Sequence, residues 1–183
     1  MKIGFVGLGI MGRPMALNLL RSGCELYVND LSEAAVKALC DQGARAASQA
    51  EIAESCEAVF TILPNGSIVH QVLLGEDGML AHMAPGTLAV DMSSITPEEA
   101  KACHRFAQER GVLFLDAPVS GGEPKAIDGT LAFMIGGTQA AFDAARPYLA
   151  YMGTSLTLVG EGGAGCVTCL LYTSDAADDL TRV

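Results

Sequence analysis

The chain has 183 residues, of which 50% are hydrophobic and none is tryptophan, and its formal net charge is −10. This length suits a single domain with a sizeable core, and the negative charge argues against a nucleic-acid partner. No apolar run is long enough to span a bilayer, which argues against a membrane protein. The first expected strand begins too early to leave room for a signal peptide, so we expect a cytoplasmic location.

Strand and helix patterns alternate almost throughout the chain, which predicts an α/β fold with a doubly wound, mainly parallel sheet covered on both faces. The expected strands are 2–7, 25–30, 45–47, 58–63, 87–91, 112–116, 131–136 and 155–159. The expected helices are 10–22, 32–42, 49–55, 67–74, 96–110 and 139–149. The helix at 96–110 starts with a capping box, because a threonine is followed three residues later by a glutamate.

A glycine motif joins the first expected strand to the first expected helix. It consists of Gly7, Gly9 and Gly12, with the spacing of a dinucleotide fingerprint. The first glycine allows the tight turn, the second lets the backbone approach a pyrophosphate, and the third lets helix and strand pack closely. The phosphates would then lie at the free N–H groups of the helix N-terminus.

An acidic residue supports this interpretation. Asp30 closes the second expected strand, 23 residues after Gly7, where an acid binds the ribose hydroxyls of NAD. A glycine-rich turn without a ligand is the less favoured alternative. The sequence therefore predicts a Rossmann-type domain that binds NAD.

Three further segments follow the carboxyl ends of expected strands, where open α/β sheets place their ligands. Residues 63–66 could pack against the cofactor, and residues 91–96 offer hydroxyl groups near the nicotinamide. Residues 116–122 supply a hydroxyl and consecutive glycine N–H groups, which suit a small carboxylate. Each segment alone could equally be a turn, since Ser, Gly, Pro and Asn favour turns for local reasons.

Other chemically interesting residues are assigned no role. Cys166 and Cys169 have the spacing of a redox or zinc motif, but a second ligand pair is missing, so we expect no metal site. Lys125 is interpreted as a solvated lysine. No motif surrounds the histidines, which are His70, His82 and His104.

The chain resembles the β-hydroxyacid dehydrogenase family over about residues 1–168. The similarity is carried by residues 7–12, 63–65 and 91–94, and above all by 116–126, which read Asp-Ala-Pro-Val-Ser-Gly-Gly-Glu-Pro-Lys-Ala. It implies cofactor contacts from Gly7, Leu8, Gly9, Ile10, Met11, Gly12, Asn29, Asp30, Leu63, Pro64, Asn65 and Ser94.

The resemblance also implies a reaction. It is hydride transfer between a nicotinamide and the carbonyl carbon of a small 3-oxo acid, whose carboxylate is bound by Ser120, Gly121 and Gly122, with Ser120 also catalytic. The most similar members reduce tartronate semialdehyde to glycerate, and 3-hydroxyisobutyrate or succinic semialdehyde are alternative substrates. Leu31 stands after Asp30 where NADP-preferring relatives carry arginine, so NAD is expected and NADP remains possible.

The resemblance fails at one functional position. The family's proton-donating lysine falls four residues after the motif at 163–165, where this chain has Cys169, a shorter and neutral side chain. The sequence from there on resembles a translated sequencing adapter. We therefore expect an NAD-binding domain at 1–162, the start of an interdomain helix at 163–168 and a non-native tail at 169–183.

By this interpretation the family's all-α C-terminal domain is missing, and the complete enzyme is a homo-oligomer. The chain itself is then expected to be largely inactive. A non-catalytic NAD-binding module is the alternative from another functional class. A nucleophilic role for Cys169 is a third and disfavoured possibility, because no basic residue lies near it in the sequence.

Overall fold

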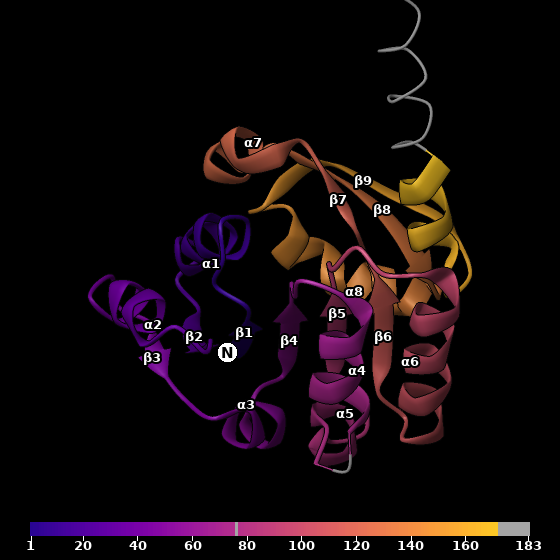
Figure 1. Cartoon of the computed structure of the whole chain (residues 1–183), viewed down its shortest axis with the longest axis horizontal. Helices are drawn as coiled ribbons and strands as arrows, with labels where there is room; N and C mark the ends of the chain where they lie inside the picture. The colour runs from indigo at the N-terminus through magenta and orange to yellow at the C-terminus, as the bar shows by residue number, and fades with distance from the viewer. Residues whose placement is uncertain (76, 172–183) are drawn as a thin grey trace, which may run out of the picture.

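The computed structural model describes residues 1–75 and 77–171, which form one sheet with helices on both faces (Figure 1). Its strands are β1 (Lys2–Val6), β2 (Glu25–Asn29), β3 (Arg45–Ala46), β4 (Ala58–Thr61), β5 (Leu88–Asp91), β6 (Leu113–Asp116), β7 (Val119–Ser120), β8 (Leu131–Gly137) and β9 (Gly153–Gly160). Its helices are α1 (Gly12–Leu20), α2 (Glu33–Cys40), α3 (Gln49–Ser55), α4 (Gly66–Leu74), α5 (Met79–His82), α6 (Pro97–Glu109), α7 (Gly122–Asp128) and α8 (Gln139–Leu149). Residues 164–171 are also helical.

The strand order confirms the predicted fold class. The sheet runs β3-β2-β1-β4-β5-β6-β8-β7, with β9 paired to β8. Strands β1 to β6 are parallel to one another, whereas β8 is antiparallel to both β6 and β7. The chain leaves β1 toward β2 on one side and later returns to β4 on the other. This topological switch opens a crevice at the carboxyl ends of β1 and β4, the usual ligand site of such sheets.

The core explains why these strands are central. All four residues of β4 are buried, as expected for a parallel strand covered on both faces. Successive side chains point to opposite faces: Phe60 packs in one hydrophobic cluster with Phe5, and Val59 packs in the other with Leu73. Helices α1 and α8 contribute to the first cluster and helices α3 to α6 to the second.

The structure contains elements that the sequence patterns did not predict. Strand β7 and helix α7 lie where a single loop was expected, and the short helix α5 follows α4. The backbone of Gly121 has φ 136° and that of Gly122 has φ 67°, so the pair makes a sharp turn from strand into helix that other residues rarely adopt. A seven-residue helix with glycine caps at both ends has too few apolar positions to show a helical period.

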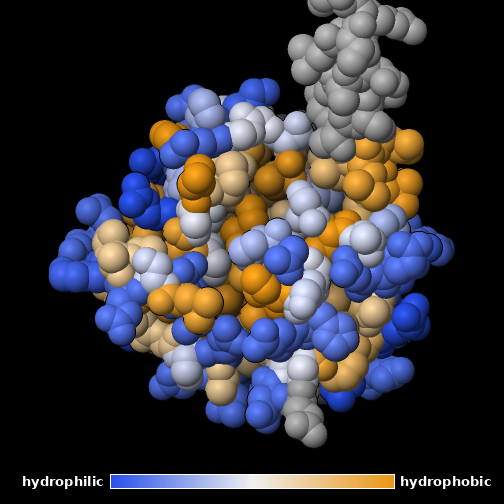
Figure 2. Space-filling view, viewed as in Figure 1, coloured by the Kyte–Doolittle hydropathy of each residue, from blue (hydrophilic) through white to orange (hydrophobic). Residues whose placement is uncertain are grey.

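The described chain ends in an apolar helix. On residues 164–171, Val167 is 41%, Leu170 51% and Leu171 63% exposed, and Figure 2 shows apolar surface over this helix. The predicted non-native tail overlaps this helix at 169–171, and its remainder lies outside the described residues. Of the helices in the described part, none has the length and apolar character needed to cross a bilayer.

Candidate functional site

A cavity of about 950 Å³ lies at the carboxyl ends of β1, β2 and β4. It brings together three segments that are distant in sequence, namely the glycine loop, the end of β2 and the loop after β4. Helix α4 forms its far wall. The predicted cofactor contacts that line it are Gly7, Gly9, Ile10, Met11, Gly12, Asn29, Asp30, Leu63 and Pro64.

Glycine is present at the three loop positions for different structural reasons. Gly7 has φ +97°, and a Cβ there would collide with the carbonyl oxygen of Ile62. A Cβ at Gly12 would collide with the carbonyl oxygen of Gly7. A Cβ at Gly9, however, would meet no atom within 4 Å. The fold therefore requires the first and third glycines, whereas the second keeps space open at the cavity.

Helix α1 begins at this loop without a side-chain cap. Its N-cap residue Met11 makes no capping hydrogen bond, and the first turn carries no acidic residue. Uncapped N–H groups and the positive end of the helix dipole attract anions. The start of α1 can therefore bind phosphate oxygens, as the fingerprint spacing predicts.

Asp30 joins the glycine loop to the start of α2. Its Oδ2 accepts a hydrogen bond from the backbone N–H of Leu8 at 2.6 Å, and its Oδ1 accepts one from Ser32 N–H at 2.7 Å. The sequence analysis predicts that this carboxylate binds the ribose, but it did not predict that the carboxylate also binds the backbone of the glycine loop. The side chain of Asn29 is engaged elsewhere, since its amide donates to the carbonyl oxygen of Ala47 at 2.7 Å.

Three predicted cofactor contacts do not line the large cavity, and one of them is Leu8 of the glycine loop. Asn65 caps α4, because its Oδ1 accepts from Ile68 N–H at 3.0 Å. Ser94 lines a second cavity of about 350 Å³, together with Pro118 and Cys169. Burial raises the pKa of the Cys169 thiol, so this side chain stays neutral near pH 7.

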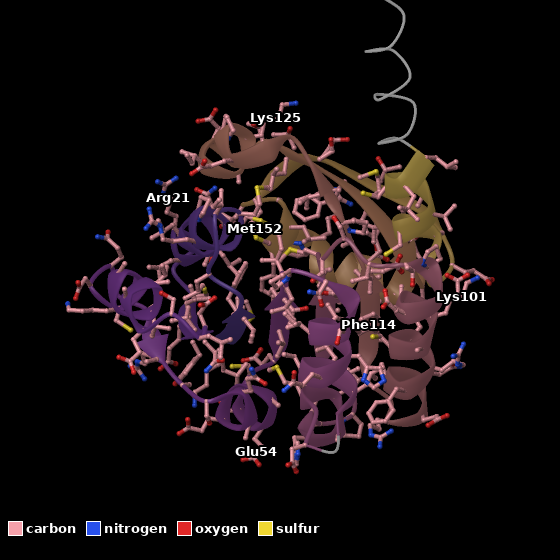
Figure 3. The ribbon with its side chains drawn as sticks, viewed as in Figure 1. Arg21, Glu54, Lys101, Phe114, Lys125 and Met152 are labelled. Atoms are coloured by element: carbon pink, nitrogen blue, oxygen red, sulfur yellow. The ribbon has the colours of Figure 1, made fainter. Side chains whose placement is uncertain are left out.

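The predicted carboxylate-binding segment forms the junction of β7 and α7. Ser120 is half-buried at the end of β7, while Gly121 and Gly122 are exposed, and none of the three lines either cavity. Lys125 packs against Gly121 along its aliphatic carbons, and its amino group points away from the sheet (Figure 3). Its exposure agrees with a solvated lysine.

A groove of about 320 Å³ lies between α1 and α7 and is also lined by the glycine loop. The buried amide of Asn18 on α1 donates to the carbonyl oxygens of Ala126, at 2.8 Å, and Ile127, at 3.3 Å. These two bonds fix α7 against α1, and the two helices lie side by side in Figure 1. The Ser120 segment is thereby held at a set position relative to the glycine loop.

The sequence analysis missed two buried aspartates, which are paired across the ends of β5 and β6. Asp91 and Asp116 are each 1% exposed. Asp116 Oδ1 accepts from Gly163 N–H at 2.8 Å and lies 2.7 Å from His104 Nε2, and Oδ2 accepts from Cys166 N–H at 3.0 Å. Asp116 therefore anchors the start of the 164–171 helix. In the sequence, the only feature that could have indicated the buried pair was an acidic residue at the end of each of the two strands.

His104 contacts buried residues of the fold and lines none of the cavities described above. Its ring packs edge-on against Phe114, with centroids 4.8 Å apart, while Nε2 contacts Asp116. Within residues 1–75 and 77–171, no three His, Cys, Asp or Glu side chains gather in a way that could hold a metal ion.

Comparison with known proteins agrees with the fold and the cavity. Residues 2–162 match the family model described as the NAD binding domain of 6-phosphogluconate dehydrogenase. The chain is 42% identical to 2-hydroxy-3-oxopropionate reductase of Escherichia coli, an alignment that covers 100% of this chain and 68% of the relative. It is 44% identical to 2-(hydroxymethyl)glutarate dehydrogenase of Eubacterium barkeri, covering 90% of this chain and 55% of that protein.

A solved structure adds to this picture. The 3-hydroxyisobutyrate dehydrogenase of Mycobacterium tuberculosis, solved with L-serine, superposes with a TM-score of 0.88 at 36% identity, covering 93% of this chain and 58% of that one. The chain thus spans between 55% and 68% of the length of these three relatives, all of which are named as enzymes that act on hydroxy or oxo acids. The chain belongs to the β-hydroxyacid dehydrogenase family, and its residues 2–162 are the family's NAD-binding domain.

Proposed function

We propose that this chain is the cofactor-binding part of an NAD(H)-dependent enzyme that reduces a small 3-oxo acid, with tartronate semialdehyde and glycerate as the substrate pair. The observation that carries the proposal is the cavity in which the glycine loop, Asp30 and the loop after β4 meet. The 42% identity to 2-hydroxy-3-oxopropionate reductase supports this substrate. Another relative is named 3-hydroxyisobutyrate dehydrogenase, so 3-hydroxyisobutyrate is an alternative substrate. Succinic semialdehyde is the other alternative, and it rests on the family resemblance alone.

Each part of the cavity has a proposed task. The uncapped start of α1 holds the pyrophosphate, and Asp30 accepts hydrogen bonds from the ribose. Leu63 and Pro64 pack against the dinucleotide, with Ser94 and Asn65 at the nicotinamide end. When bound, the nicotinamide supplies the hydride.

The oxo acid is proposed to bind beside this end. Its carboxylate is held by the Ser120 hydroxyl and the N–H groups of Gly121 and Gly122. The proton for the carbonyl oxygen comes, in the complete enzyme, from a lysine at the position of Cys169. Under this proposal residues 163–168 begin the interdomain helix, 169–183 are a non-native tail, and the complete enzyme is a homo-oligomer with an all-α C-terminal domain.

A non-catalytic NAD-binding module is the second candidate function. The observation that favours it is the Cys169 side chain, which is neutral and shorter than lysine and so brings no positive charge to a carbonyl oxygen. An assay with NADH and tartronate semialdehyde separates the two candidates, because only the first predicts NADH consumption once a lysine-containing helical domain completes the chain.

The cofactor site is tested most directly at Gly9. Replacing Gly9 by alanine is expected to leave the free energy of unfolding within about 0.5 kcal/mol of the parent, since the added Cβ meets no atom within 4 Å. The same methyl group occupies space that a pyrophosphate needs, so NADH affinity should fall by about tenfold or more. Calorimetric titration and chemical denaturation measure the two quantities. Unchanged NADH affinity in a folded Gly9→Ala protein would contradict the proposed site.

The preference for NAD is tested at Asp30. The cavity is lined by two carboxylates, Asp30 and Asp77, and by no lysine or arginine among its described lining residues. A 2′-phosphate would therefore meet negative charge without a cationic partner. Asp30→Asn removes that charge but keeps an oxygen that accepts from Leu8 N–H, so the ratio of NADH to NADPH affinity should fall by about tenfold.

Asp30→Ala is the matched variant for this prediction. It also removes the hydrogen bond to Leu8 N–H, so the affinities for both nucleotides should fall. Parallel titrations of the two variants with NADH and NADPH separate the electrostatic effect from the effect on the loop. A ratio that rises in Asp30→Asn would overturn the assignment to NAD.

A further inference from the structure

Asp91 presents an unexplained feature. It ends β5, is 1% exposed, and its Oδ1 accepts hydrogen bonds from Ser93 Oγ at 2.6 Å and Thr61 Oγ1 at 2.7 Å. Its Oδ2 has no hydrogen-bond partner among the described residues. A buried carboxylate with one bare oxygen is unfavourable for folding, so its presence calls for a function.

The hydrogen bonds around Ser93 have a defined direction. An ionised carboxylate only accepts, so the single Ser93 hydroxyl proton is donated to Asp91. The Ser93 oxygen is then free to accept, and Leu63 N–H donates to it at 2.8 Å. The result is a relay that runs from the Leu63 backbone through Ser93 to Asp91.

This relay fixes a short stretch of backbone next to the large cavity. Thr61 ends β4 and binds Asp91 directly, while Leu63 binds it through Ser93. Both ends of residues 61–63 are thus tied to one carboxylate. Between them, the carbonyl oxygen of Ile62 lies so close to Gly7 that only glycine fits there, so a shift of this stretch would move the glycine loop as well.

We propose that Asp91 and Ser93 are positioning residues for the cofactor. They hold Ile62 and Leu63, which line the dinucleotide cavity, whereas neither Asp91 nor Ser93 lines it. The inference rests on the proposed cofactor site. It adds a role for the buried hydrogen bonds that join Thr61, Ser93 and Asp91 next to that site. Asp91 orients the serine hydroxyl and, through it, one wall of the site.

The test compares two variants that each remove one hydroxyl-to-backbone hydrogen bond. Ser93→Ala removes the acceptor of Leu63 N–H, and Thr138→Ala removes the acceptor of Ala141 N–H at the start of α8, away from all three cavities. NADH titration at a temperature where both variants are folded should show about five- to tenfold weaker binding for Ser93→Ala. Thr138→Ala should bind NADH as the parent does.

Asp91→Asn serves as the conservative variant. Its amide oxygen still accepts from Ser93 and Thr61, so the relay persists and NADH affinity should stay within about twofold of the parent. If Ser93→Ala binds NADH as tightly as the parent, the proposal is wrong. A merely structural role would lower stability in both alanine variants without this difference in affinity.

Hydrogen exchange separates this proposal from the proposed function. In the unliganded protein, the Leu63 amide should exchange at least about tenfold faster in Ser93→Ala, because the hydroxyl oxygen that accepts from it is lost. In Thr138→Ala its exchange rate should equal that of the parent. If the parent binds no NADH, the proposed function fails, and the Leu63 exchange rate still tests the relay. Unchanged Leu63 exchange in Ser93→Ala would overturn the relay itself.

Discussion

Replacing Asp116 by alanine is expected to lower the free energy of unfolding by about 3–5 kcal/mol. The carboxylate is 1% exposed and accepts hydrogen bonds from Gly163 N–H and Cys166 N–H while contacting His104. Its loss leaves these donors without their acceptor inside the protein, and unpaired buried donors carry the full cost of their desolvation. Chemical denaturation followed by circular dichroism measures the effect.

Two further variants make this result specific. Asp116→Asn keeps one acceptor oxygen and should lose less stability than the alanine variant. Asp143→Ala removes an exposed carboxylate that accepts from Gln139 on the same helix, and it should change stability by less than about 0.5 kcal/mol. Equal, small losses in Asp116→Ala and Asp143→Ala would show that Asp116 does not anchor the 164–171 helix.

Asp91 is expected to make stability depend on pH between about 4 and 6. Burial is the main cause that raises the pKa of its carboxyl group from 3.8 to about 6, and the nearby Asp116 adds to the rise. Between these values the folded protein holds a proton that the unfolded chain has released. Folding therefore takes up a proton there, and stability falls as the pH rises from about 4 to about 6.

The size of the effect follows from the two pKa values. Their difference corresponds to about 3 kcal/mol, which the folded protein gains when Asp91 is protonated. Asp91→Asn cannot titrate at this position, so the stability of the parent relative to this variant should increase by about 2 kcal/mol from pH 7 to pH 4, with the remainder gained at lower pH. Because other acids titrate equally in both proteins, a constant difference across this range would refute the raised pKa.

Much of the fold was predictable because its signals are local. Ser32 and Thr96 begin helices α2 and α6 as expected, and the hydroxyl oxygen of each accepts a hydrogen bond from the backbone N–H three residues later. Apolar strands separated by amphipathic helices predicted the parallel sheet, and the strand order confirms it. The elements that were missed, such as β7 and α7, are too short to show a period.

The candidate site was predictable in part. The spacing of Gly7, Gly9 and Gly12, with Asp30 after the next strand, correctly indicated a dinucleotide domain. The individual contact roles remain predictions, and the structure separates them into groups. Most of the predicted cofactor contacts line one cavity, Ser94 faces another, and Ser120 lies in neither.

The sequence by itself determined the glycine loop and the sheet, because turn geometry and strand–helix alternation depend on residues close together in the chain. Only the tertiary structure decided which polar groups meet beneath the loop. Leu63 reaches Ser93 across 30 residues and Asp116 reaches Cys166 across 50, contacts that exist because strand order places β4, β5 and β6 side by side. Burial makes the stability of the protein depend on the hydrogen bonds of Asp91 and Asp116, because a charge removed from water is stabilised only by the donors that the fold brings to it.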